Sequence, residues 1–180
     1  MTILVCGGVR SGKSSFAQEL TLQLSRGKHY YVATMIPTDA DDQERIRLHL
    51  LDRADMGFET IEQGRDILHT LSVANFDAAF LVDSVTALFM NELFPPEKNY
   101  AMDESAAQRC ADDLITFARI VKNAVFVSDY IFSDSLRYDN TTECYRRGLG
   151  HIHCALAEAC DTVIEVISGQ TIIHKGVLPE

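Results

Sequence analysis

The residues best suited to do chemistry form a glycine-rich loop near the amino terminus, which reads Gly7-Gly8-Val9-Arg10-Ser11-Gly12-Lys13-Ser14 and is followed by Ser15. In the spacing Gly-x-x-x-x-Gly-Lys-Ser, backbone N–H groups surround phosphate oxygens, and the helix that follows adds partial positive charge. Lys13 is expected to reach the β- and γ-phosphates, and Ser14 to bind Mg²⁺. The alternative, a glycine-rich turn with a chance lysine, explains neither the apolar run before the loop nor the helical pattern after it. We therefore predict a site for the phosphates of a nucleoside triphosphate.

A carboxylate at the end of an apolar run is the second candidate. Asp83 follows Ala78-Ala79-Phe80-Leu81-Val82, which reads as a buried strand. An acid in this position of a P-loop protein commonly holds magnesium or its water, so Ser14 and Asp83 are the predicted metal ligands. The alternative is that Asp83 only caps the helix that begins next.

A histidine between two arginines is the third candidate. Arg45, His49 and Arg53 are four residues apart, so they share one face of a helix. Such a stripe can grip a triphosphate while a neutral imidazole attacks phosphorus, and the nearby arginines favour the neutral form. The alternative is a solvated surface histidine.

A possible metal cluster is a weaker candidate site, because His151 and His153 are two residues apart and point different ways on a helix. The other two members of this cluster would be Cys154 and Cys160. We do not expect a metal site there.

Strand and helix patterns alternate along the chain. The expected strands are 3–7, 29–34, 58–62, 78–83, 124–128, 162–167 and 171–174. The expected helices are 13–25, 39–53, 66–72, 85–94, 103–122 and 143–159, with a loop over 132–142. We expect Ile46, Leu48, Leu50 and Leu51 to form the apolar side of the second helix. The inner side of the fifth helix is expected to be Ala106, Cys110, Leu114, Phe117 and Ile120.

This alternation predicts an α/β fold, a P-loop NTPase-like, mostly parallel sheet with helices on both faces. The last two strands are joined by Ser168-Gly169-Gln170, which predicts an antiparallel hairpin at one edge. We expect a single domain over residues 1–180, with the site off the carboxyl ends of the parallel strands.

Composition narrows the function. The chain has 180 residues and a formal net charge of −10, which argues against a nucleic-acid partner. No apolar run approaches the roughly 20 residues that a membrane span needs, and the start lacks the features of a signal peptide. We expect a cytoplasmic protein whose five cysteines are reduced.

Further segments resemble one family in order and spacing, the bifunctional adenosylcobinamide kinase/adenosylcobinamide-phosphate guanylyltransferases of cobalamin biosynthesis. Besides the glycine-rich loop, they are Tyr31-Val32-Ala33-Thr34, Arg45-Ile46-x-x-His49-x-x-x-Arg53, Thr60-Ile61-Glu62 and Val82-Asp83-x-x-Thr86-x-x-x-x-Asn91-x-Leu93. The resemblance covers nearly the whole chain and is most specific over residues 3–94.

This resemblance implies two reactions at one P-loop site. A nucleoside triphosphate, ATP or GTP, phosphorylates adenosylcobinamide. GTP then guanylylates a histidine, which falls on His49 here, and GMP passes to the corrinoid phosphate to give adenosylcobinamide-GDP. The flanking arginines fall on Arg45 and Arg53, and Thr34 and Glu62 are implied to join the nucleotide site. The resemblance also implies a homotrimer with nucleotide sites near the subunit boundaries.

The second half departs from the family pattern. Where the family usually has Thr-Asn-Glu-Val-Gly, this chain has Ser128-Asp129-Tyr130-Ile131-Phe132, and His153 replaces an asparagine of the late helix. We expect these departures to bear on corrinoid binding or the kinase step and to leave the nucleotide half intact. Two other interpretations stay open: a P-loop kinase or nucleotidyltransferase with a changed acceptor, and a nucleotide-binding module without catalysis.

Overall fold

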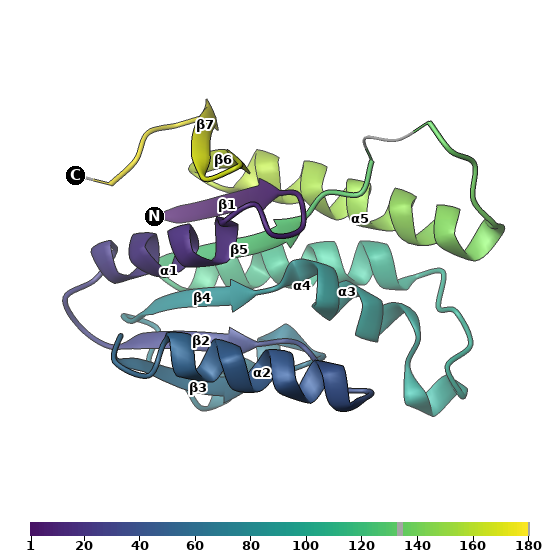
Figure 1. Ribbon diagram of the computed structural model, residues 1–180, viewed down its shortest axis with the longest axis horizontal. Helices are drawn as coiled ribbons and strands as arrows, with labels where there is room; N and C mark the ends of the chain where they lie inside the picture. Colours follow the sequence, from purple (N-terminus) through teal and green to yellow (C-terminus); the bar gives the residue numbers. More distant parts are fainter. Residues whose placement is uncertain (133–134, 180) are drawn as a thin grey trace.

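One seven-stranded sheet forms the centre of the molecule, with the strand order β3-β2-β4-β5-β1-β6-β7 (Figure 1). The computed structural model describes residues 1–132 and 135–179, and the side chains of Arg45, His49 and Asp52 lie outside the described part. The strands are β1 (Thr2–Gly7), β2 (His29–Ala33), β3 (Phe58–Glu62), β4 (Ala79–Asp83), β5 (Asn123–Asp129), β6 (Thr162–Ile167) and β7 (Gln170–Lys175). Every neighbouring pair is parallel except β6 and β7. The predicted sheet and its antiparallel edge hairpin are therefore confirmed.

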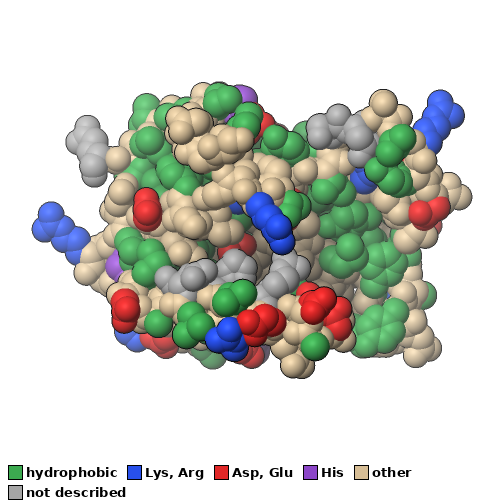
Figure 2. All heavy atoms as spheres, viewed as in Figure 1, with side chains coloured by type: hydrophobic (Ala, Val, Ile, Leu, Met, Phe, Trp, Pro, Cys, Tyr) green, Lys and Arg blue, Asp and Glu red, His purple; other side chains and the backbone are tan. Residues whose placement is uncertain are grey.

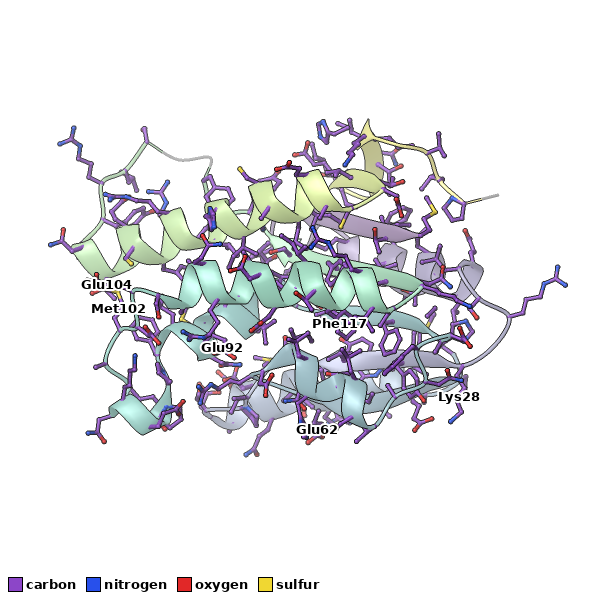
Figure 3. All side chains as sticks on the ribbon, turned by 180° about the vertical axis from the view of Figure 1, so that it is seen from behind. Lys28, Glu62, Glu92, Met102, Glu104 and Phe117 are labelled. Carbon is purple, nitrogen blue, oxygen red and sulfur yellow. The ribbon has the colours of Figure 1, made fainter. Side chains whose placement is uncertain are left out.

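Helices cover both faces of this sheet. They are α1 (Lys13–Gln23), α2 (Ala40–Asp52), α3 (Val85–Leu93), α4 (Ala106–Ile120) and α5 (Asn140–Ala159), with short 3₁₀ turns η1 (Ile67–Ser72) and η2 (Pro96–Lys98). Helices α1 and α2 lie over one face (Figure 1). Figure 3, seen from behind, shows α4 and α5 over the other face, where Phe117 of α4 is fully buried.

The core is divided by the sheet into two layers, because successive side chains of a strand point to opposite faces. Ile3 and Val5 pack with Ala17 and Leu20 of α1. Leu4 points the other way, into a larger cluster with residues of α3, α4 and α5. Burial on both faces explains why the central strands read as continuous apolar runs.

The predicted inner face of α2 is wrong, and that of α4 is wrong at one residue. Leu48, Leu50 and Leu51 of α2 are 46%, 44% and 58% exposed. Residues 46 and 50 share one side of a helix and residues 48 and 51 another, so this set makes no single apolar face. In α4, Ile120 at the last position is 44% exposed, whereas the other predicted inner residues are buried.

Helices α5 and α4 begin at residues other than the predicted ones. Helix α5 begins at Asn140, three residues early, because the Asp139 carboxylate accepts bonds from the backbone N–H groups of Thr141 and Thr142. Helix α4 begins at Ala106, and the Asp103 carboxylate accepts a bond from the N–H of Ser105 in the turn before it. The predicted helix over 66–72 is the 3₁₀ turn η1. Within the described residues, no helix has both the length and the apolar character to cross a membrane.

Candidate nucleotide-binding site

The glycine-rich loop connects β1 to α1 in the predicted strand–loop–helix context. Gly12 has φ +92°, a left-handed conformation that favours glycine. A Cβ on Gly7 would lie 2.6 Å from the Val166 carbonyl oxygen and 2.7 Å from Ser11 Oγ, so a side chain does not fit there. In the described part of the chain, the Ser11 hydroxyl is buried without a protein hydrogen-bond partner. The loop is therefore a tight backbone turn, and its buried Ser11 hydroxyl can still bond to a ligand.

Neighbouring strands hold this loop in place. The backbone N–H of Gly169, in the β6–β7 turn, donates to the Ser11 carbonyl at 2.9 Å, and the N–H of Tyr130 donates to the Gly7 carbonyl at 3.2 Å. Within the loop, the N–H of Ser11 donates to the Gly8 carbonyl at 3.2 Å. The supports from residues 130 and 169 were not predicted, because they come from the far half of the sequence.

The first turn of α1 carries Lys13, Ser14 and Ser15. Lys13 is buried, and its Nζ lies 2.5 Å from Asp129 Oδ1 and 3.2 Å from the Gly8 carbonyl. Ser14 is half-buried and Ser15 exposed. This turn contains neither an acidic residue nor a side-chain cap, so its N–H groups and partial positive charge remain for an anion. Gly8 is half-buried, and Val9 and Arg10 are exposed at the tip of the loop.

Asp83 lies at the same edge of the sheet. It is half-buried at the end of β4, and Tyr31 Oη donates to Asp83 Oδ2 at 2.8 Å. Helix α3 is capped instead by Ser84, whose Oγ accepts from the N–H of Ala87 at 3.2 Å. The alternative that Asp83 caps this helix is therefore wrong. A carboxylate and the Ser14 hydroxyl are oxygen ligands, which suit Mg²⁺ when water and phosphate complete its shell, and α1 packs against β4.

Arg53, immediately after α2, is joined to this carboxylate through Tyr31. Its side chain is 5% exposed, its guanidinium carbon lies 3.7 Å from the Tyr31 ring centroid, and it donates to Thr60 Oγ1 at 3.4 Å. Burial, more than the adjacent Asp83 carboxylate, raises the pKa of Tyr31, while Arg53 opposes the rise. Tyr31 therefore remains a protonated donor to Asp83.

The remaining predicted residues of the nucleotide site differ in their burial and in their contacts. Thr34 is buried, and its hydroxyl donates to the Ser84 carbonyl and accepts from the Ser84 N–H, both at 2.7 Å. It thus fixes the β4–α3 junction. Glu62 is exposed at the end of β3, in register with Ala33, which also pairs with Asp83 (Figure 3). Residues 45 and 49 lie in α2, but their side chains are outside the described part.

The departures from the family pattern converge on one region beside the loop. His153 Nε2 lies 2.7 Å from Ser128 Oγ, which lies 3.1 Å from Thr86 Oγ1. Burial lowers the pKa of His153 to about 4, partly offset by Asp129. A cavity of about 530 Å³ lies between α5 and the β1–β6–β7 edge, lined by Leu4, Cys6, Tyr130, Phe132, His153, Cys154, Ala157, Val163, Ile164, Glu165 and His174. No group of three metal-ligating side chains was found among the described residues.

The face of the molecule that carries α1 and α2 is hollowed as well. Figure 2 shows the hollow near the centre of the face that carries α1 and α2, with a basic side chain at its rim and acidic side chains nearby. In Figure 1 the carboxyl ends of β1, β4 and β5 all point to the right, where the loop between β1 and α1 also lies.

The strand–glycine loop–helix unit, its buried lysine and the mostly parallel sheet define a protein of the P-loop class. Solved structures agree on the fold. The flagellar accessory protein FlaH of Methanocaldococcus jannaschii is 16% identical with a TM-score of 0.54, over 97% of this chain and 78% of that one. An ATPase from a bacterial type III secretion system is 12% identical with a TM-score of 0.57, over 91% and 50%.

Sequence comparison places the chain within this class. The profile of the cobinamide kinase/cobinamide phosphate guanyltransferase family matches residues 3–173. The chain belongs to this family of enzymes, as the resemblance predicted. The bifunctional adenosylcobalamin biosynthesis protein CobU of Salmonella typhimurium is 31% identical, over 94% of this chain and 97% of its own length. The corresponding protein CobP of Pseudomonas aeruginosa is 28% identical, over 98% of each chain.

Proposed function

We propose that this enzyme phosphorylates adenosylcobinamide and then transfers GMP from GTP to adenosylcobinamide phosphate, giving adenosylcobinamide-GDP. The observation that carries the proposal is the family match over residues 3–173, with a fully formed P-loop inside it. Both reactions use the phosphates of a nucleoside triphosphate, and the site has one such loop in the described residues.

In the phosphoryl transfer, the backbone of residues 7–12 and the first turn of α1 hold the phosphates, and Lys13 places its charge on the β- and γ-phosphates. The residues that would hold Mg²⁺ are Ser14 and Asp83. When bound, this ion would neutralise charge on the transferring group. The Tyr31 hydroxyl orients the Asp83 carboxylate, and the Arg53 guanidinium packs on the Tyr31 ring.

In the guanylyl transfer, His49 is the nucleophile. An imidazole nitrogen forms a bond to the α-phosphorus of GTP, the bond to the bridging oxygen breaks, and pyrophosphate leaves. An oxygen of the corrinoid phosphate then takes the GMP and frees His49. The position of α2 supports this role. Arg53 lies one helical turn, about 6 Å, after residue 49, and its side chain reaches Tyr31 beside Asp83.

A trapping experiment tests the histidine. After incubation with [α-³²P]GTP, the protein should carry label that is stable to base and labile to acid, as expected of a phosphoramidate, and mass spectrometry should find GMP on His49. His49→Ala should carry no label and transfer no GMP, yet phosphorylate adenosylcobinamide. The matched control is His69→Ala, an exposed histidine of η1, which should label normally. GMP on another residue, or transfer by His49→Ala, would refute the assignment.

A second candidate is the same chemistry on a changed acceptor. The observation in its favour is that Tyr130, Phe132 and His153, which depart from the family pattern, line one cavity beside the loop. Turnover of adenosylcobinamide decides between the two. A protein that becomes labelled by GTP but passes neither phosphate nor GMP to adenosylcobinamide has a different acceptor.

We also propose Mg²⁺ as the cofactor, ATP or GTP as phosphoryl donor, and a homotrimer of one-domain subunits. Support for the trimer comes from family resemblance alone, and light scattering coupled to size-exclusion chromatography tests it. A monomer at assay concentration would contradict this proposal.

A further inference from the structure

A second carboxylate, besides Asp83, lies at the phosphate site. Asp129 ends β5, pairs in register with Gly7, and carries its Oδ1 2.5 Å from Lys13 Nζ. The backbone N–H of Asp129 donates to Thr86 Oγ1 of α3 at 2.8 Å. The backbone of Asp129 is thus held both by the sheet and by a helix, its carboxylate is held by Lys13, and its side chain remains 24% exposed.

The two carboxylates differ in what stays beside them once phosphates bind. Asp83 keeps the Tyr31 hydroxyl at 2.8 Å. The cation beside Asp129 is Lys13, the same group that a triphosphate attracts. A negative side chain next to a bound triphosphate opposes binding by Coulomb repulsion. Where the family usually has Asn-Glu, this chain has Asp129-Tyr130, so the acid lies one residue earlier here. A fixed, partly exposed carboxylate at this point is suited to accept a proton.

We infer that Asp129 is the general base of the phosphoryl-transfer step, an inference that rests on the kinase activity proposed above. The acceptor hydroxyl oxygen forms a bond to the γ-phosphorus. The bond from the γ-phosphorus to the β–γ bridging oxygen breaks, and its electron pair leaves with the nucleoside diphosphate. The hydroxyl proton passes to the Asp129 carboxylate and then to water. Because Lys13 turns to the phosphates, Asp129 is released for this proton only when nucleotide is bound.

The second reaction gives an internal comparison. Its acceptor is a phosphate oxygen, which has no hydroxyl proton to lose, and a neutral imidazole attacks with a free lone pair. Guanylyl transfer therefore does not need this base. Removing the Asp129 carboxylate should separate the two reactions, whereas removing the predicted magnesium ligand Asp83 should lower both.

The test is Asp129→Asn, which keeps the shape of the side chain and the backbone bond to Thr86. Phosphorylation of adenosylcobinamide should fall roughly 10²-fold or more at saturating nucleotide, while guanylyl transfer to preformed adenosylcobinamide phosphate stays within about fivefold of wild type. Nucleotide should bind no more weakly, since a repulsive charge is gone. The control is Asp77→Asn, an exposed acid paired with Lys122 away from the loop, which should change neither reaction.

Three results would overturn the inference: phosphorylation within about threefold of wild type, parallel loss of both reactions, or weaker nucleotide binding. The last two would make Asp129 a structural partner of Lys13. The slow hydrolysis of nucleotide by water supplies a readout that needs no corrinoid, because water must also lose a proton. If wild type does not phosphorylate adenosylcobinamide, the proposed function fails, and hydrolysis still decides. A fall of about tenfold in Asp129→Asn supports the base, and unchanged hydrolysis refutes it.

Discussion

Lys13 is paired before any phosphate arrives. Its ammonium lies between the Asp129 carboxylate and the Gly8 carbonyl, and its stem is buried in the first turn of α1. When phosphates bind, the Lys13 ammonium therefore exchanges the Asp129 carboxylate for phosphate oxygens. Its positive charge is what the site requires of this residue.

Lys13→Met keeps most of the buried stem and removes the charge. We expect both transfer reactions to fall by about 10²-fold or more, because a positioned donor to the phosphates is lost. Each reaction is measured with its own acceptor, and circular dichroism checks that the fold persists. The matched control is Lys28→Met, an exposed lysine paired with Glu59 at 3.0 Å. Wild-type turnover by Lys13→Met would contradict the P-loop assignment.

Sequence was informative about residues wherever the chemistry is local. The loop over residues 7–14 and the acid after a buried run are motifs that can be read from neighbouring positions. Asp129 and the Gly169 support were missed, because they reach the loop through strand register and a distant turn. The alternative that Asp83 caps helix α3 was wrong because Ser84, one residue later, is the cap.

Helix α2 is the element whose placement most affects the proposed chemistry. Three of its leucines are about half exposed, so apolar burial gives it little anchorage. Arg53, directly after its last residue, is buried against Tyr31 and Thr60. The end of the helix is thereby attached to β2 and β3 beside the phosphate site.

Arg53→Met tests this attachment. The substitution keeps packing volume and removes the cation over the Tyr31 ring, so we expect the free energy of unfolding to fall by about 2 kcal/mol. Guanylyl transfer should fall more than phosphoryl transfer, because α2 carries His49. Urea unfolding and the two assays measure these effects. Arg47→Met, on the exposed side of α2 and paired with Glu44, should alter none of them. Equal losses in both reactions would contradict a specific role for α2.

Elements were predictable where burial follows a simple period. Strands over 58–62 and 162–167 were predicted with the observed bounds, since apolar residues mark them on one or both faces. The inner side of α2 was not, because four apolar residues at positions 46, 48, 50 and 51 circle the helix. The start of α5 depended on the Asp139 cap, a side-chain bond that a polar loop composition conceals.

At the scale of the whole molecule, stability should depend on the protonation of His153. Burial lowers its pKa to about 4 from an ordinary 6.5. The folded state therefore binds fewer protons than the unfolded chain between these values. Above pH 6.5, His153 is neutral in both states and leaves the free energy of unfolding at its full value. This free energy falls as the pH drops toward 4.

We expect this group alone to reduce the free energy of unfolding by roughly 3 kcal/mol between pH 7 and pH 4. Urea unfolding at pH 7, 5.5 and 4 measures the total change. His153→Asn should show a smaller fall over this window, and His151→Asn, an exposed histidine of the same helix, should match wild type. Coincident pH profiles for His153→Asn and wild type would show that the folded state protonates His153 normally.

The hydrogen bond from Gly169 to Ser11 joins the phosphate loop to a turn far along the chain. During synthesis on the ribosome, the loop emerges early, but β5 and β6, the strands that flank β1, and the Gly169 turn emerge much later. At roughly 5–20 residues per second, the loop waits many seconds for these supports. A partly synthesised chain therefore lacks a finished phosphate cradle, and nucleotide capture becomes one of the last events in the making of this enzyme.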